Sequence, residues 1–330
     1  MNKKRYLKIR RGGFGVKKKN KRTKVKISRD DIELTLLALP TFIWYVVFSF
    51  LPMIGILIAF KDFRMIPGQG FITSLFKSEW VGFTNFEFLF KTPDASIIIR
   101  NTILYNTLFI ILGTVVPVAL AIGITQLYSK TLAKVCQTAM FLPHFLSWVV
   151  VSYFVFAFLS YDKGIINQVL GALGKNPVQW YMQDQYWPYI LVFMQIWKTV
   201  GYGMVVYLAA IAGIDQTYYE AAVIDGATKW QQIKYVTLPL IKPIIIIMFI
   251  MAVGNIFKSD FGLFYQVPKN AGTLFNTTAT IDTYVYKAIE GTGSMAMSSA
   301  AAFFQSIIGF ITILAANTIV KKIDGENGLF

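Results

Sequence analysis

Charged side chains are scarce in this chain of 330 residues, of which 15% are Asp, Glu, Lys or Arg and 55% are hydrophobic. Soluble domains carry about a quarter charged residues, so this composition excludes an ordinary cytosolic enzyme and indicates a bilayer environment. Cysteine and histidine occur once each, as Cys136 and His144. Because one of each cannot build a disulfide or a structural zinc site, we expect no catalytic residues, no metal ligands and no cofactor in this chain.

Most of the chain has little excess of basic over acidic residues, although the net charge is +15. Residues 1–32 hold fourteen Lys and Arg against Asp30 and Asp31, which leaves only +3 elsewhere. The Lys-rich stretch 17–26 could bind anionic lipid or nucleic acid, but a solvated tail explains the same residues. We interpret residues 1–32 as a basic cytoplasmic tail that sets membrane orientation, and we expect no nucleic-acid partner.

Long stretches without charge predict six transmembrane helices, because about 20 apolar residues cross the hydrocarbon core. Four stretches have no charge, and two carry a single lysine, Lys198 or Lys242. The predicted spans are 34–60, 101–129, 135–161, 186–214, 238–257 and 294–320. The sequence therefore predicts an all-α polytopic membrane protein.

The basic tail also predicts the orientation, since Lys and Arg beside membrane spans are retained on the cytoplasmic side. Six spans then place both termini and loops 130–134 and 215–237 inside, with 61–100, 162–185 and 258–293 outside. This gives a first transmembrane helix at 33–61, an extracytoplasmic segment at 62–100, a five-helix core at 101–322 and a C-terminal tail at 323–330.

The cytoplasmic loop 215–237 reads as two short helices separated by a turn. Thr217 and Glu220 have capping-box spacing, Asp225-Gly226 breaks the first helix, and Thr228 can cap a second one. Taken alone, these residues are explained by helix formation. The small side chains of Ala221 and Ala222 would also let a partner approach the backbone closely, as in a docking helix.

The complete spacing of this loop resembles the EAA loop of binding-protein-dependent ABC import permeases. The matching positions are Glu220-Ala221-Ala222, Gly226, Val236 and Leu238-Pro239. Further segments resemble the carbohydrate branch of that family, the maltose-type permeases, and in particular the subgroup that handles complex oligosaccharides. They are Trp80-Val81-Gly82, Asn85-Phe86, Asn101-Thr102, Leu142-Pro143-His144-Phe145, Ser147-Trp148-Val149-Val150, Ala209-Ala210-Ile211 and Ile214-Asp215.

This resemblance implies a type I ABC importer (MetI-like) transmembrane domain in a bacterial cytoplasmic membrane, with 33–61 as a peripheral helix. It implies a second permease subunit in a heterodimer, two copies of a cytoplasmic ATPase that uses MgATP, an extracytoplasmic solute-binding protein and an oligosaccharide cargo. The ATPase-coupling residues would be Glu220, Ala221, Ala222, Asp225 and Gly226. The chain has no G-x-x-x-x-G-K-[ST] segment, so we expect ATP hydrolysis in the partner.

A substrate path is predicted around Lys198, because a lysine near the bilayer centre costs roughly 2.5–3.5 kcal/mol unless it faces water or a partner. Sugars present apolar C–H faces and hydroxyls, which suit aromatic rings beside polar groups. The candidates are Gln195, Trp197, Lys198, Tyr202, Asn255 and Phe257, with His144 and Trp148 as weaker ones. Ordinary helix packing, or pairing of Lys198 across helices, explains the same residues. An acidic oligosaccharide would give Lys198 a charge to neutralise.

Other functions stay open at this point. The coupling loop indicates the class of transporter but not its cargo. A polyamine, phosphate, peptide or amino acid is therefore an alternative to sugar. A membrane scaffold that recruits an ATPase without transport is a second alternative. A channel or secondary carrier is the third.

Overall fold

The computed structural model describes residues 29–292, 294–323 and 328, and within them the secondary structure is helical apart from one bridge between Lys61 and Trp80. The chain divides into two compact units at Ile54. In the first unit, α1 (Arg29–Tyr45) continues into a π-helix, η1 (Val46–Phe50), and then into η2 (Leu51–Phe60), a 3₁₀ segment that runs into the second unit. Most of the basic tail 1–32 and of the C-terminal tail 323–330 lies outside the described residues.

Five helical segments in the described part of the chain are long and apolar enough to cross a bilayer. They are Asp30–Phe60, Ala95–Thr125, Asp184–Ala212, Lys229–Val253 and Met295–Lys322. A bent pair, Lys130–Phe145 and Trp148–Leu159, brings the number to six if it forms one span. Five of the six predicted spans therefore correspond to long apolar helices, and the predicted third span corresponds to the bent pair.

The prediction of one continuous third span at 135–161 is wrong. The chain turns by 102° between α5 (Lys130–Phe141) with its 3₁₀ extension η4 (Leu142–Phe145) and α6 (Trp148–Leu159). Pro143 cannot donate a helical hydrogen bond. Ser147 then starts a new helix, because its side chain accepts a hydrogen bond from the Val150 N–H, 3.3 Å away.

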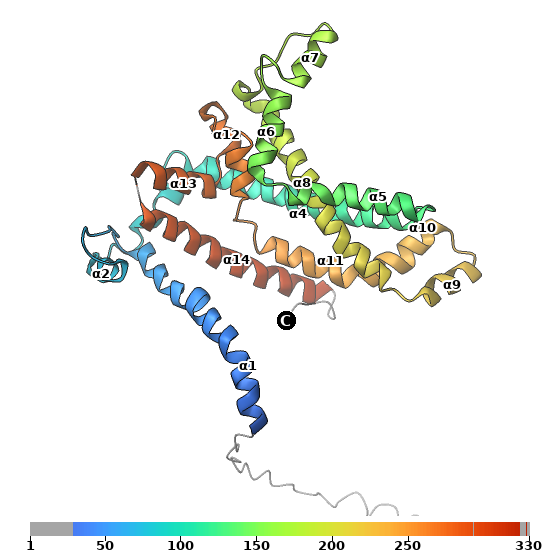
Figure 1. Cartoon of the computed structure of the whole chain (residues 1–330), viewed down its shortest axis with the longest axis horizontal. Helices are drawn as coiled ribbons and strands as arrows, with labels where there is room; N and C mark the ends of the chain where they lie inside the picture. The colour runs from blue at the N-terminus through green and yellow to red at the C-terminus, as the bar shows by residue number, and fades with distance from the viewer. Residues whose placement is uncertain (1–28, 293, 324–327, 329–330) are drawn as a thin grey trace, which may run out of the picture. The chain divides into compact units, whose positions relative to one another are not determined.

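The long helix α4 (Ala95–Thr125) packs along α8 (Trp187–Ala212), and α5 lies against the same helix (Figure 1). Two glycines allow these close contacts. A side chain at Gly201 would collide with the Met140 backbone of α5, and one at Gly203 would lie 3.1 Å from Pro117 of α4. The arrangement therefore holds the break of the third span against the middle of α8.

The fifth span is longer than predicted and includes the second coupling helix. α10 (Lys229–Gln232) passes through a π-helix, η7 (Ile233–Thr237), into α11 (Leu238–Val253). Pro239 lies in the first turn of α11, directly after the wide π turn, and the helix runs through this position without a break. α11 crosses α14 (Met295–Ile323) where Gly254 and Gly309 meet, with no space for a side chain at either position.

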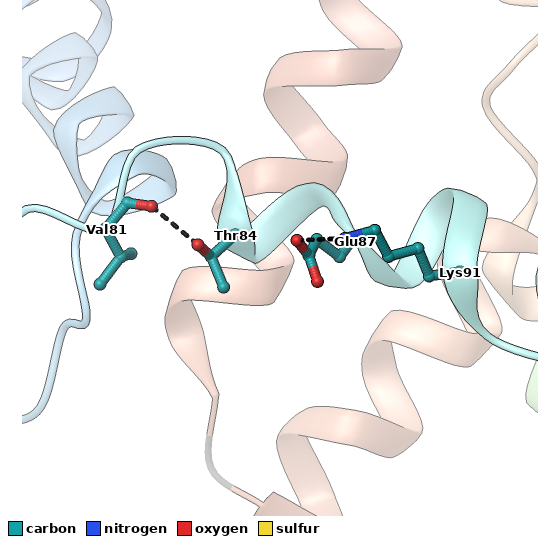
Figure 2. A network of polar contacts seen from close by, with 4 residues as sticks. All are labelled: Val81, Thr84, Glu87 and Lys91. Carbon is teal, nitrogen blue, oxygen red and sulfur yellow. Dashed lines mark hydrogen bonds and ion pairs between the residues drawn. The ribbon is translucent and has the colours of Figure 1, made fainter.

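Short helices fill the three segments predicted to be external. The first holds α2 (Phe71–Lys77), η3 (Thr84–Phe86) and α3 (Phe88–Lys91). Figure 2 shows two of its local contacts, a hydrogen bond from Thr84 Oγ1 to the Val81 carbonyl and an ion pair of Lys91 with Glu87. The second holds α7 (Ile165–Ala172), η5 (Trp180–Met182) and η6 (Asp184–Tyr186), and the third holds η8 (Gly262–Gln266), η9 (Gly272–Leu274), α12 (Phe275–Thr278) and α13 (Ile281–Thr292).

Candidate functional site

The first coupling helix, α9 (Gln216–Ile224), is capped by Asp215, whose carboxylate accepts a hydrogen bond from the Thr217 N–H at 3.0 Å. The same bond lowers the pKa of Asp215, since it stabilises the charged carboxylate. The predicted capping box of Thr217 and Glu220 is therefore wrong, because the helix starts earlier. The sequence marks Asp215 only as part of the family-like segment Ile214-Asp215, and its role as the helix cap was not predicted.

The turn after α9 requires glycine at one position. Gly226 has φ of +78°, a conformation that other residues adopt at a cost. The Ala227 N–H donates to the Ala222 carbonyl at 2.8 Å, which closes the end of α9. Thr228 and Gln231 then form a capping box at the start of α10, as the sequence predicts for Thr228.

The coupling loop presents apolar side chains to its surroundings. Ile224 is 85% exposed and Trp230 is 74% exposed. Asp225, Gly226 and Ala221 are also exposed, and Ala222 is half-buried. Exposed apolar residues grouped on a polar loop are typical of a surface that contacts another protein.

Glu220 lies one helical turn before Ile224 on α9, and both residues line the same hollow. This hollow of about 910 Å³ lies between the coupling helices and the ends of α4, α5 and α8. Within this region the Tyr219 hydroxyl and the Thr237 Oγ1 are 2.9 Å apart, which ties α9 to η7. Movement of α9 is therefore linked to the start of the fifth span.

Lys198 lies at the break of the third span. Its Nζ donates to the His144 carbonyl at 3.0 Å and sits 5.3 Å from the centre of the Trp148 ring. The Trp148 indole N–H donates to Asp260 Oδ2 at 2.7 Å, and its ring packs against Gly262. The broken third span and α8 thus meet at Lys198, which lies about 17 Å along α8 at 1.5 Å per residue. Asp260, from the segment after the fifth span, reaches this region through Trp148.

The other α8 candidates differ in their surroundings. Tyr202 is exposed and stacks on His144, with ring centres 4.9 Å apart. Gln195 has a buried side-chain oxygen that finds no hydrogen-bond partner in the described part of the chain. Trp197 lines an apolar hollow of about 630 Å³ with Met194 and Phe193, so packing accounts for its position.

Asn255 and Phe257 belong to a different set of contacts. The Asn255 side chain donates to the Met251 carbonyl of its own helix at 3.1 Å. Phe257 packs against Phe304, and its carbonyl accepts a hydrogen bond from Gln305 at 2.7 Å. The structure therefore brings His144, Trp148, Lys198 and Tyr202 together and places Asn255 and Phe257 near α14.

Two carboxylates of this region were missed by the sequence reasoning. Asp260 holds Trp148, while Asp282 accepts hydrogen bonds from the Ser259 N–H at 2.7 Å and from Gln305 at 3.2 Å. Burial raises the pKa of Asp282, which lies in the segment before the last span. Gln305, a polar residue within a predicted span, was the available signal for this contact. No group of three or more potential metal ligands occurs in the described residues.

Comparisons with known proteins agree with this geometry. The family model described as binding-protein-dependent transport system inner membrane component matches residues 113–325. Protein LplB of Bacillus subtilis (strain 168) is 36% identical over 301 residues, which cover 91% of this chain and 92% of LplB. The polygalacturonan/rhamnogalacturonan transport system permease protein YteP of the same organism is 32% identical over 314 residues, with 95% of each chain covered.

A solved structure has the same fold. It is the crystal structure of a bacterial alginate ABC transporter in complex with alginate pentasaccharide-bound periplasmic protein. One of its chains is 32% identical to this chain, with a TM-score of 0.79, over 92% of this chain and 100% of that chain.

Proposed function

Since this chain belongs to the family of binding-protein-dependent transport system inner membrane components, we propose that it forms half of the import path for an acidic oligosaccharide. It is a multi-pass transport subunit with the all-α type I ABC importer fold, and it is not an enzyme. We further propose the class of cargo, the residues of the site and the partner subunits.

Lys198 is the observation that carries the choice of cargo. In the described part of the chain its ammonium group contacts a carbonyl and an indole ring, and neither neutralises its charge. A cation at this depth is stabilised by an anionic partner. Polygalacturonan and alginate, named for YteP and for the solved transporter, are both polymers of uronic acids. A uronate carboxylate would supply the missing charge.

The arrangement around Lys198 also suits a sugar ring. Trp148 and Tyr202 offer aromatic faces beside the lysine, and the unpartnered oxygen of Gln195 is an acceptor for a sugar hydroxyl. Trp197, Asn255 and Phe257 are kept as further candidates along the path. Packing of Trp197 and Phe257 makes their role indirect.

The proposed assembly contains a second permease in a heterodimer, two cytoplasmic ATPases that bind MgATP, and an extracytoplasmic solute-binding protein. The exposed apolar residues Ile224 and Trp230, next to Asp225 and Gly226, support an ATPase docking surface on loop 215–237. Closure of the ATPases would move α9 and α10, and α10 would carry that motion into the fifth span. In this proposal both termini are cytoplasmic, 33–61 is a peripheral transmembrane helix, and 101–322 is the core.

Lys198→Met tests the cargo class directly. We expect uptake of tetragalacturonate by the reconstituted transporter to fall by about tenfold or more, because a charge-assisted contact is lost. Uptake of neutral maltotetraose, even if slow, should change little. Lys198→Arg, which keeps the charge, serves as the matched control. Equal losses for the acidic and the neutral sugar would contradict the charge-based assignment.

A further inference from the structure

A third hollow lies at the C-terminal end of α6. It has a volume of about 760 Å³, within the range of small-molecule sites. Aromatic side chains line it, namely Phe156, Tyr161, Trp180 and Tyr181, together with the polar Asp162, Lys163 and Gln179. We call it the arm hollow, because most of its lining residues belong to the arm of residues 160–182 that includes α7 (Figure 1), and the others, such as Phe156, belong to α6.

The arm is held in one conformation by a buried amide. The Asn167 side chain donates to the Tyr161 and Val178 carbonyls at 3.1 and 2.9 Å, and it accepts from the Val178 N–H and the Trp180 indole at 3.0 Å each. The Trp187 indole adds a bond to the Trp180 carbonyl at 2.8 Å. The aromatic wall is therefore preorganised, which lowers the entropy cost of binding a ligand.

A strained lysine stands at the edge of this hollow. Lys269 and Asn270 have φ of +56° and +50°, a left-handed conformation that is uncommon for residues other than glycine. Lys269 Nζ lies 3.7 Å from the centre of the Tyr153 ring and 5.3 Å from that of Phe156, which lines the hollow. Backbone strain of this kind is concentrated at functional sites. Its effect here is to place an exposed ammonium group beside the aromatic wall.

We propose that the arm hollow binds a uronate unit of the cargo oligosaccharide outside the membrane, before the sugar reaches Lys198. The pyranose ring lies against the exposed ring of Tyr161, and its carboxylate pairs with Lys269 and Lys163. Asp162 and Gln179 accept or donate hydrogen bonds to the hydroxyls. This inference rests on the proposed function for the orientation of the chain and for the class of cargo.

The choice of a sugar over a lipid chain follows from the charges. Lys163 and Lys269 are both exposed, and both are within or beside the aromatic wall. A lipid chain would gain contact with the aromatic rings but would offer no hydrogen-bond or ionic partner to the polar groups. These groups are the ammonium groups of Lys163 and Lys269, the carboxylate of Asp162 and the amide of Gln179. An acidic sugar satisfies both kinds of surface.

Protection from cysteine labelling tests the arm hollow. Cys136 is the single cysteine of the chain, so Cys136→Ser with Met182→Cys places one thiol at the lining of the hollow. The assembled transporter in nanodiscs, without the solute-binding protein, is labelled with a membrane-impermeant maleimide. Tetragalacturonate should slow the labelling in a saturable way, and maltotetraose should not. Leu173→Cys on the same arm, outside the hollow, is the control and should label at an unchanged rate.

Two further variants separate this site from the one at Lys198. Lys269→Met in the Met182→Cys background should raise the tetragalacturonate concentration for half protection about tenfold, and Lys269→Arg should restore it. Lys198→Met should leave the protection unchanged, so the two proposals can fail independently.

Several results would overturn the proposal. They are absence of protection by tetragalacturonate, equal protection by maltotetraose, and protection that survives Lys269→Met. A thiol at position 182 that is blocked in nanodiscs without sugar and reacts in detergent would show that lipid fills the hollow, which also overturns it.

Discussion

Gly226 is the residue at which the cytoplasmic loop reverses between α9 and α10. Its φ of +78° is readily adopted by glycine, and no atom lies within 4 Å of an added Cβ. The backbone angle, and not a lack of space, therefore favours glycine at this position. A change of residue at this position therefore tests the conformation of the turn without altering its packing. Any loss of function would come from the direction in which α10 leaves the turn.

We predict a graded series at this position. Gly226→Asn should keep docking of the ATPase, because Asn tolerates the left-handed region. Gly226→Ala should weaken docking through a strain of about 1 kcal/mol, and Gly226→Pro should abolish it, since φ is fixed near −65°. Co-purification of the ATPase with the inserted permease measures the effect. Full transport by the Pro variant would mean that the loop is only a connection.

At the scale of elements, the contact of α5 with α8 depends on Gly201, where an added Cβ would collide with the Met140 backbone. We predict that Gly201→Ala lowers the stability of the purified permease by about 1–3 kcal/mol, as overpacked cores do. Thermal unfolding in detergent measures this loss. Gly213→Ala near the end of the same helix is the matched control, because its closest atom is an ordinary 3.5 Å away. Similar midpoints for the two variants would argue against a tight α5–α8 contact.

The elements also show how far sequence reasoning reaches. Span positions follow from uncharged length because the cost of burying charge is local to each segment. The break after Phe145 was missed, although Pro143 signalled it. Lys198 of α8 and Asp260, in the segment after α11, contact the residues at the break, and such long-range contacts are not visible in a local pattern. A local pattern also does not reveal that the π turn η7 joins α10 to α11 in one continuous helix.

The site was partly predictable for the same physical reasons. Gly226 acts through its own φ, and Thr228 acts through a side-chain hydrogen bond to a backbone N–H three residues later, so local spacing alone predicts the turn and the cap. Lys198 stood out as a charge at membrane depth. The partner of Trp148 and the ring contacts of Lys269 come from segments far apart in the sequence, and no periodic pattern marks them.

At the scale of the whole molecule, the family and the all-α polytopic fold are confirmed, and the membrane orientation stays a prediction. We expect cysteines placed in 162–185 to react with an impermeant reagent from outside, and cysteines in 215–237 to react only after the membrane is opened. A Cys136→Ser background makes each introduced thiol unique. The opposite pattern would reverse the orientation and place both the arm hollow and the ATPase surface on the wrong sides.

The unbroken helix from Lys229 to Val253 constrains how this protein can vary in length. These 25 residues join the coupling loop to the Gly254–Gly309 crossing. One inserted residue would turn everything beyond it by about 100° and shift it by about 1.5 Å. The glycine at position 254 would then face away from α14. We therefore expect relatives to vary in length in the external segments. The number of residues between the coupling loop and this crossing should stay the same.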